Sequence, residues 1–339
     1  MLEKPDIPDD SILESLRVEY NLDATRVSFL PIGADINSAV YRVMTRDGSA
    51  FFLKLRKVDF DPTSVELPKF LSDQGIAQII PPIAMPTGQL WGSLGVFKTI
   101  LYPLIDGRDG YNTDLTGEHW QQLGAALKKI HASRIPERLL NCIRKETYSA
   151  AGRETVKMFL ARVQNKVFDD PISNELTIFL NTKRAEILKL VGRTEQYAGA
   201  LSTQRLETVV CHSDIHAGNI LIGVDRSLYI VDWDEPILAP KERDLMYIGG
   251  GLLDSGLTPQ EEEALFYRSY VRVQIHAVAL AYYRYERIIQ DLAAYCEQIF
   301  LTNHGREDRE EALYYLKSNF FPNSTIEIAY QSDPKKTKG

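Results

Sequence analysis

Residues 209–236 read VVCHSDIHAGNILIGVDRSLYIVDWDEP and carry the most informative pattern in the chain. Two apolar runs, Ile220–Ile222 and Leu228–Val231, flank a short Gly-Val-Asp-Arg-Ser segment, which predicts an antiparallel hairpin. A hairpin returns the chain to the end from which it started. Asn219 and Asp232 are therefore expected side by side, about 5 Å apart as paired strand positions are.

The polar side chains around this hairpin suit phosphoryl transfer. The amide oxygen of Asn219 and the carboxylate of Asp232 are hard donors of the kind that Mg²⁺ prefers. Asp214 lies five residues before Asn219, in a polar loop that follows a short predicted strand at 209–211, so it can reach an incoming hydroxyl. The reaction needs charge neutralisation and a carboxylate that accepts the proton of that hydroxyl. We therefore predict Asp214 as the catalytic base, with Asn219 and Asp232 as metal ligands.

The rest of the chain changes character after about 100 residues, which is the basis of the predicted fold class. Residues 39–45 and 50–55 are rich in β-formers and are separated by Arg46-Asp47-Gly48-Ser49, a strong hairpin signal. A further strand is expected at 96–102. Helical spacing predicts helices at 11–20, 65–74, 116–131, 153–166, 173–193, 259–275 and 277–302. A β-rich beginning and a mainly helical remainder predict an α+β protein with two lobes.

Two segments resemble signature motifs of aminoglycoside and choline kinases. His212–Asn219 (HSDIHAGN) resembles their HxDxxxxN loop, and Ile230–Trp233 (IVDW) resembles their metal-binding IDW or IDF segment. The pair at this spacing is highly specific, and the chain is similar to the aminoglycoside phosphotransferase family. Residues 123–131, 241–246 (KERDLM) and 282–287 (YYRYER) look like the spectinomycin phosphotransferase branch of that family, so the resemblance covers nearly the whole chain. It implies ATP as donor, Mg²⁺ as cofactor, and antibiotic resistance by O-phosphorylation of an aminocyclitol such as spectinomycin.

The resemblance also implies a protein-kinase-like division of the chain. Residues 1–101 would form a small antiparallel β N-lobe that binds nucleotide, and residues 102–105 would form the hinge. Residues 106–330 would form a larger, mainly helical C-lobe for catalysis and substrate, and residues 331–339 a flexible tail. Adenine would bind at the hinge, which makes Tyr102 and Leu104 candidate nucleotide contacts.

Further candidate residues for nucleotide binding lie in the first lobe. Lys54 falls on the second strand of the early hairpin, on the face opposite Leu53 and Leu55. In kinases such a lysine contacts the α- and β-phosphates and is held by a helix carboxylate. Glu66 is the candidate for that carboxylate. Two alternatives stay open: Lys54 could be a solvent-facing lysine of an edge strand, and Glu66 could lie on a solvated helix face. The loop at 31–38 occupies the position of a phosphate-covering loop, with Gly33, Asn37 and Ser38 as candidates, but it has one glycine where the kinase form is glycine-rich.

The candidate substrate residues are polar groups near the motif and on a late helix. Asp234 and Glu235 follow the metal-binding aspartate, and they either line the substrate site or cap the next turn. Arg284 and Glu286 are the polar members of an aromatic-rich helix, where most such stripes are core packing. For Asp244 two roles are open, one orienting the catalytic loop and one as a buried ion-pair partner.

Composition limits the partners of the chain. The 339 residues carry a formal net charge of −7, which argues against broad binding to nucleic acid or to anionic membranes. Such a charge suits a small, polyhydroxylated, cationic substrate beside the nucleotide. The three cysteines show no disulfide framework, no run of about 18 apolar residues occurs, and the acidic N-terminus is unlike a signal peptide. A cytoplasmic protein is expected, and the sequence does not predict an oligomeric state.

Three alternatives to an antibiotic kinase stay open at this stage. One is a metabolic kinase of the same family, with an amino alcohol or a sugar as acceptor. Another is a nucleotide-binding module without turnover. The third is a metal-dependent hydrolase, because His212-x-Asp214-x-His216 could be a fragment of a zinc site.

Overall fold

The structure, a computed structural model, describes residues 4–32, 37–57, 60–251, 253, 255–271, 273–302 and 305–334. The chain divides into two units. One contains the chain up to Ile143 together with Ala217–Pro236, and the other contains Arg144–His216 together with the residues from Ile237 onward. The chain therefore passes from the second unit to the first inside the polar loop at 212–219.

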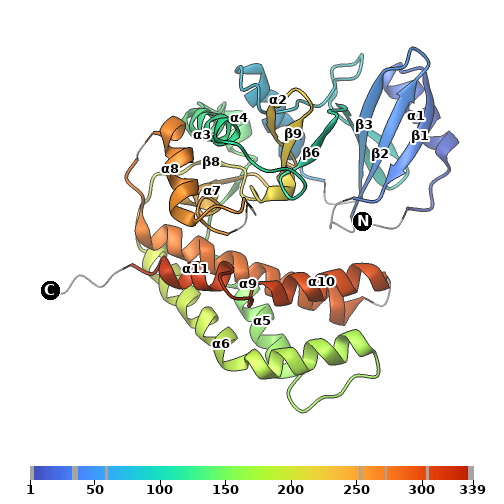
Figure 1. The fold of residues 1–339 in the computed structure, drawn as a ribbon. Helices are drawn as coiled ribbons and strands as arrows, with labels where there is room; N and C mark the ends of the chain where they lie inside the picture. Colours follow the sequence, from blue (N-terminus) through green and yellow to red (C-terminus); the bar gives the residue numbers. More distant parts are fainter. Residues whose placement is uncertain are drawn as a thin grey trace. The chain divides into compact units, whose positions relative to one another are not determined.

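An antiparallel sheet begins the first unit (Figure 1). Its strand order is β1-β2-β3-β5-β4, and its strands are β1 (Ala24–Leu30), β2 (Ser38–Thr45), β3 (Ala50–Arg56), β4 (Gly92–Leu94) and β5 (Phe97–Pro103). The predicted β2–β3 hairpin is confirmed, with Gly48 at a positive φ of 87° in its turn. The sequence did not predict β1 and β4. Both are edge strands that pair on one side only, so neither has the strong apolar alternation of a central strand.

The core of this unit lies between the sheet and the first helix, α1 (Asp9–Tyr20). Buried side chains from the helix and from the strands form one cluster, which includes Ile12, Leu16, Tyr20, Tyr41, Val43, Leu53 and Leu55. Because side chains alternate along a strand, burial of Leu53 and Leu55 places Lys54 on the opposite face of β3. This is the orientation that the sequence predicts.

A second, small sheet carries the motif hairpin. Its order is β10-β9-β6, with β6 (Gly107–Asp109), β9 (Ile220–Gly223) and β10 (Leu228–Ile230). Ile230 pairs with Ile220, and the backbone N–H of Val231 donates to the carbonyl of Asn219 at 3.0 Å. The predicted antiparallel hairpin is confirmed. The remaining helices of the unit are α2 (Thr63–Asp73), α3 (Gly117–Ala132) and α4 (Glu137–Leu140).

The second unit is mainly helical. Its short strands β7 (Arg144–Lys145), β8 (Val209–Cys211) and β11 (Ile237–Ala239) form a sheet in the order β7-β11-β8. Its helices are α5 (Ala151–Arg162), α6 (Pro171–Ser202), α7 (Glu242–Leu245), α8 (Pro259–Tyr270), α9 (Ala277–Leu301), α10 (Arg306–Ser318) and α11 (Thr325–Gln331). α9 contacts α5, α6, α7, α10 and α11, and so forms the centre of this unit (Figure 1).

The predicted helices are present, with shifted ends. α6 extends beyond the predicted residues 173–193 at both ends. It begins at Pro171, whose fixed φ suits the first helical position, and the side chain of Asp170 accepts the N–H of Ser173 as an N-cap. Glycine disfavours a helix interior, and α6 contains Gly192 and Gly199, but its face with Leu190, Val191 and Leu201 is buried, so packing outweighs propensity.

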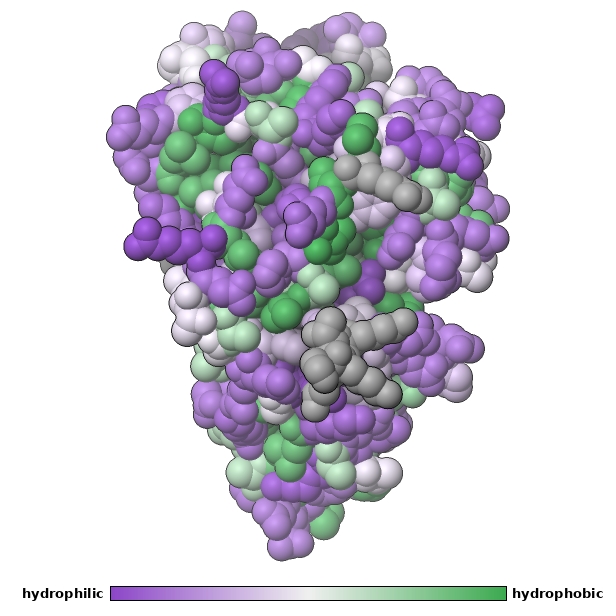
Figure 2. All heavy atoms as spheres, turned by 90° about the vertical axis from the view of Figure 1, so that its left-hand side faces the viewer, coloured by the Kyte–Doolittle hydropathy of each residue, from purple (hydrophilic) through white to green (hydrophobic). Residues whose placement is uncertain are grey.

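The surface is mostly polar on the face shown in Figure 2, where hydrophobic residues form separate patches among hydrophilic ones. In the part of the chain that the structure describes, none of the helices combines the length and apolarity needed to cross a bilayer. The mixed α+β architecture is that of a protein-kinase-like fold.

Candidate active site

The open end of the motif hairpin places the two predicted metal ligands at neighbouring positions. Asn219 ends a short 3₁₀ turn (Ala217–Asn219) and is buried, with 6% of its surface exposed. Asp232 lies two residues beyond the paired Ile230, has a positive φ of 64°, and leaves 46% of its side chain exposed. Both groups offer oxygen donors, which is the set that a hard divalent cation requires.

Lys54 reaches this end of the hairpin from strand β3. Its Nζ lies 2.7 Å from Oδ1 of Asp232 and 2.7 Å from Oδ2 of Asp234. Arg56 follows on the same face of the strand and also pairs with Asp234. Arg56 was not among the residues predicted from the sequence, although its spacing of two residues from Lys54 places it on the same face of the strand.

These charges shift the proton affinities of the cluster. Burial alone would lower the pKa of Lys54, but the carboxylates of Asp232 and Asp234 outweigh it, so the pKa lies above its ordinary value. Burial raises the pKa of Asp234 to about 6, while Lys54 and Arg56 act in the opposite direction. Burial likewise raises the pKa of Tyr102, which is close enough to feel the charge of Lys54. Lys54 is thus a fixed positive charge at this site.

The polar loop at 212–216 is held by a buried aspartate of the second unit. Asp244, which is fully buried in α7, accepts the backbone N–H of His212 at 3.0 Å and that of Ser213 at 2.7 Å. Ser213 has a φ of 75°, in the left-handed region where residues other than glycine rarely lie. Of the two roles left open for Asp244, the structure shows the first, the orientation of this loop.

Asp214 follows directly and contacts one arginine, one tyrosine and one histidine. Its Oδ1 pairs with Nη1 of Arg287 and lies 3.1 Å from the hydroxyl of Tyr247, while its Oδ2 lies 3.6 Å from Nε2 of His216. Burial would raise the pKa of Asp214, but Arg287 and the histidines at 212 and 216 outweigh it and hold the pKa below its ordinary value. Asp214 is therefore a carboxylate at neutral pH, as a general base must be.

Glu66 does not meet Lys54 in this structure. Its Oε2 instead accepts a hydrogen bond from Arg138 at 3.0 Å, while Asp232 and Asp234 surround the lysine. Local sequence could not reveal this partner, because Arg138 is 72 residues away in the chain.

The other predicted nucleotide contacts lie around the first sheet. The backbone carbonyl of Asn37 accepts the N–H of Lys57 at 2.9 Å, Ser38 begins β2, and Leu104 follows β5. Gly33 lies outside the described residues.

The four predicted substrate residues differ in their surroundings. Asp234 bonds the two cations of β3, and Glu235 is exposed. Arg284 donates to the backbone carbonyls of Met246 and Ile248, at 3.3 and 2.9 Å. Glu286 forms a buried ion pair with Arg153 at 2.7 Å. Arg284 and Glu286 thus bond other groups of the protein, and Arg287, next to them on α9, was not among the predicted residues.

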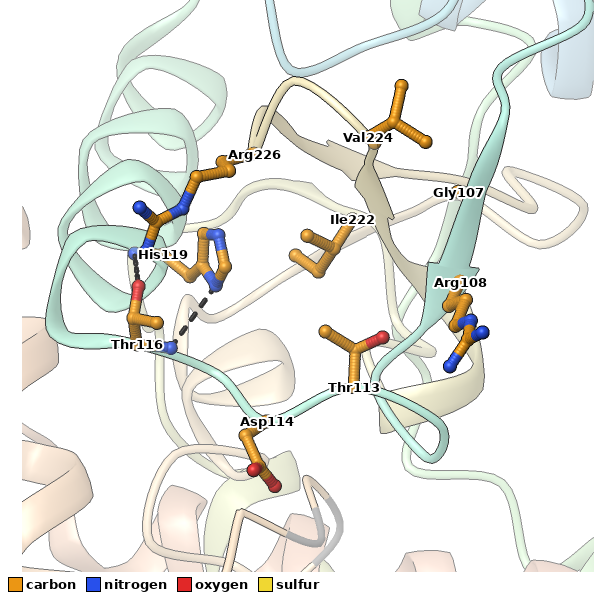
Figure 3. Close-up of a pocket in the computed structure, with 10 residues that line it drawn as sticks. Gly107, Arg108, Thr113, Asp114, Thr116, His119, Ile222, Val224 and Arg226 are labelled. Carbon is orange, nitrogen blue, oxygen red and sulfur yellow. Dashed lines mark hydrogen bonds between the residues drawn. The ribbon is translucent and has the colours of Figure 1, made fainter.

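A pocket of about 390 Å³ opens elsewhere in the first unit, between β6, the start of α3 and the tip of the motif hairpin (Figure 3). It contains none of the predicted site residues. Its lining residues are Gly107, Arg108, Thr113, Asp114, Thr116, His119, Ile222, Gly223, Val224 and Arg226.

A strand lysine beside two carboxylates, a hairpin flanked by Asn219 and Asp232, and an ionised aspartate on a braced loop together define a phosphotransferase with a protein-kinase-like fold. Comparison with known families agrees. The model of the phosphotransferase enzyme family matches residues 28–272, and the chain belongs to this family. This membership decides against the hydrolase alternative.

Solved structures of spectinomycin phosphotransferase are similar over nearly the whole chain. The complex with ADP and spectinomycin is 37% identical, with a TM-score of 0.90 and coverage of 97% of this chain and 99% of that one. The AMP-bound complex is 35% identical, with a TM-score of 0.86 and coverage of 97% and 100%. An amicoumacin kinase complex with AMP-PNP and Ca²⁺ is 15% identical, with a TM-score of 0.61 and coverage of 96% and 94%, and is alike in fold.

Proposed function

We propose that this enzyme transfers the γ-phosphoryl group of ATP to a hydroxyl of spectinomycin or a closely related aminocyclitol. The observation that carries the proposal is the end-to-end similarity to spectinomycin phosphotransferase, in a chain that has Lys54, Asp214, Asn219 and Asp232 at the motif positions. With ATP as donor, we place the reaction in the cytoplasm.

In this proposal the first unit handles the nucleotide. Asn219 and Asp232 would hold Mg²⁺, since an amide oxygen and a carboxylate fit its preference for oxygen ligands. The ion, when bound, would neutralise charge on the transferred phosphoryl group. Lys54 adds a permanent positive charge for the phosphates, and we assign Asp234 to hold that lysine in place.

Further nucleotide contacts are proposed from the kinase-like division at residues 102–105. Backbone groups between Tyr102 and Leu104 would hold the adenine, and Asn37 and Ser38 would lie over the phosphates. Glu66 is not proposed as the partner of Lys54, because Arg138 occupies its carboxylate.

The second unit supplies the base. Asp214 would orient the acceptor hydroxyl and take its proton as the new O–P bond forms and the bond to the leaving ADP breaks. Direct in-line transfer needs no phosphoenzyme. The net charge of −7 and the exposed carboxylate of Glu235 suit an acceptor that carries ammonium groups.

An acceptor panel tests this function. ATP consumption is measured with spectinomycin, other aminoglycosides, amino alcohols and sugars, and the phosphorylated position is mapped by NMR. We expect turnover with spectinomycin, and an Asp214→Asn variant that binds Mg-nucleotide nearly as well as the wild type while losing most turnover. Turnover confined to amino alcohols or sugars would favour the metabolic kinase instead. Tight nucleotide binding with no turnover on any acceptor would favour a binding module.

A further inference from the structure

Two donors from outside the catalytic loop meet on one oxygen of Asp214. Nη1 of Arg287 and the hydroxyl of Tyr247 both bond Oδ1, and Nη1 of Arg287 lies 3.2 Å from that same hydroxyl. The three groups therefore form a closed triangle. The Tyr247 hydroxyl has one hydrogen, which is shared between the carbonyl of Ser213 at 2.9 Å and Oδ1 of Asp214 at 3.1 Å.

Helix α9 anchors both donors. Asp291, one turn further along the helix, pairs with Nε of Arg287 at 3.0 Å and fixes the direction of the guanidinium. One turn earlier, Arg284 bonds the carbonyls of Met246 and Ile248, which flank Tyr247 in the sequence. Asp291 thus pairs with Arg287, and Arg284 holds the segment around Tyr247.

This arrangement restrains the rotation of the Asp214 carboxylate. Rotation of the carboxylate would break the bonds of Oδ1 to Arg287 and Tyr247, and buried hydrogen bonds to a charged group are costly to lose. These bonds therefore hold the carboxylate in one orientation.

We propose that Arg287 and Tyr247 are positioning residues that lock the Asp214 carboxylate in the orientation in which it takes the acceptor proton. The proposal rests on the phosphotransferase function given above. It assigns no contact with the acceptor to Arg287, whose guanidinium is already shared between Asp214 and Asp291.

The charges around Asp214 predict the direction in which its pKa should change when Arg287 is replaced. The groups that face it are Arg287 and Asp291 on α9, Tyr247 after α7, and the histidines at 212 and 216 on its own loop. Burial would raise the pKa of Asp214, and Arg287 is the largest effect that opposes it. Loss of the guanidinium charge should thus raise the pKa of Asp214.

The test compares Arg287→Lys, Arg287→Met and Tyr247→Phe with the control Arg306→Met, an exposed helix arginine paired with Glu310. We expect Arg287→Met to lower kcat about 10²-fold or more, since small misplacements of catalytic groups cost this much. KM for ATP should change little, Arg287→Lys should recover part of kcat, Tyr247→Phe should lose less, and the control should match the wild type. The acid limb of kcat against pH should move to higher pH in Arg287→Met.

Two further measurements keep the outcome decisive. If Arg287→Met fails to fold because Asp291 is stranded, Arg287→Met/Asp291→Leu removes both charges. The pKa of Asp214, read by ¹³C NMR of carboxyl-labelled protein with Asp214→Asn to identify the signal, needs no acceptor, so it tests the inference even if the proposed function fails. An unchanged Asp214 pKa, or a large rise in acceptor KM with kcat preserved, would overturn the proposal.

Discussion

Replacing Asp244 by asparagine tests how the catalytic loop is held. The carboxylate accepts two backbone N–H groups, from His212 and Ser213, one on each oxygen, and it is fully buried. Asparagine keeps the size of the side chain but has one oxygen. One N–H would keep its acceptor, and the other would face an amide NH₂ group.

The expected loss follows from these contacts. A hydrogen bond to a charged group contributes about 1.5–3 kcal/mol, and holding Ser213 in the left-handed region costs about 1–2 kcal/mol that the bonds now offset. We expect the free energy of unfolding to fall by about 2–4 kcal/mol. The loop should also relax and displace Asp214, which lowers kcat by about 10²-fold or more.

Urea denaturation followed by circular dichroism measures the first effect, and the ATP-coupled acceptor assay measures the second. Asp225→Asn is the matched control, because this exposed aspartate also accepts a backbone N–H, that of Ser227, at 3.0 Å. Its free energy of unfolding should change by less than about 1 kcal/mol. If Asp244→Asn is as stable and as active as Asp225→Asn, the carboxylate does not hold the loop and the reasoning is wrong.

Three other outcomes follow from the described contacts. Lys54→Met should raise KM for ATP at least about 10-fold and lower kcat, measured by steady-state kinetics, whereas Lys69→Met at an exposed helix pair should do neither. Burial raises the pKa of Glu262 above 4.5, so the folded state binds this proton more tightly, and the free energy of unfolding should fall as the pH rises from about 4 through that pKa. Denaturation at several pH values measures this slope, and Glu262→Gln should flatten it. If the slope persists in Glu262→Gln, another group causes it. Glu286→Leu should lower the free energy of unfolding by about 3–5 kcal/mol, because it leaves the buried Arg153 without its ion-pair partner. Arg153→Met/Glu286→Leu should recover most of that loss. If the effects of the two single substitutions simply add in this double-mutant cycle, the prediction is wrong.

The sequence predicts well what depends on short stretches of chain. The hairpin before Asp232 follows from two apolar runs and a turn, and its antiparallel pairing is confirmed, but Asn219 lies opposite Val231 and not opposite Asp232 as predicted. The face on which Lys54 lies follows from the alternation of Leu53 and Leu55. In both cases the decisive geometry is set within a few residues.

Contacts between distant segments were beyond such reasoning. Arg287 meets Asp214 across 73 residues and Arg138 meets Glu66 across 72, so both pairs depend on how helices dock. Helix α9 shows the difficulty most clearly, because Arg284, Glu286 and Arg287 are equally polar in the sequence. Only the packing of the helix decides which one reaches the base.

The two units interleave along the chain, because Ala217–Pro236 belongs with the first 143 residues while the segments on either side of it do not. Neither unit can be excised as one uninterrupted fragment. A chimaera spliced once after Ile143 would pair β6 of one parent with β9 of the other, across a contact that includes Gly107 against Gly223. Hybrids of this enzyme with a relative should therefore tolerate exchange best when the hairpin travels with the N-terminal part, which requires three breakpoints.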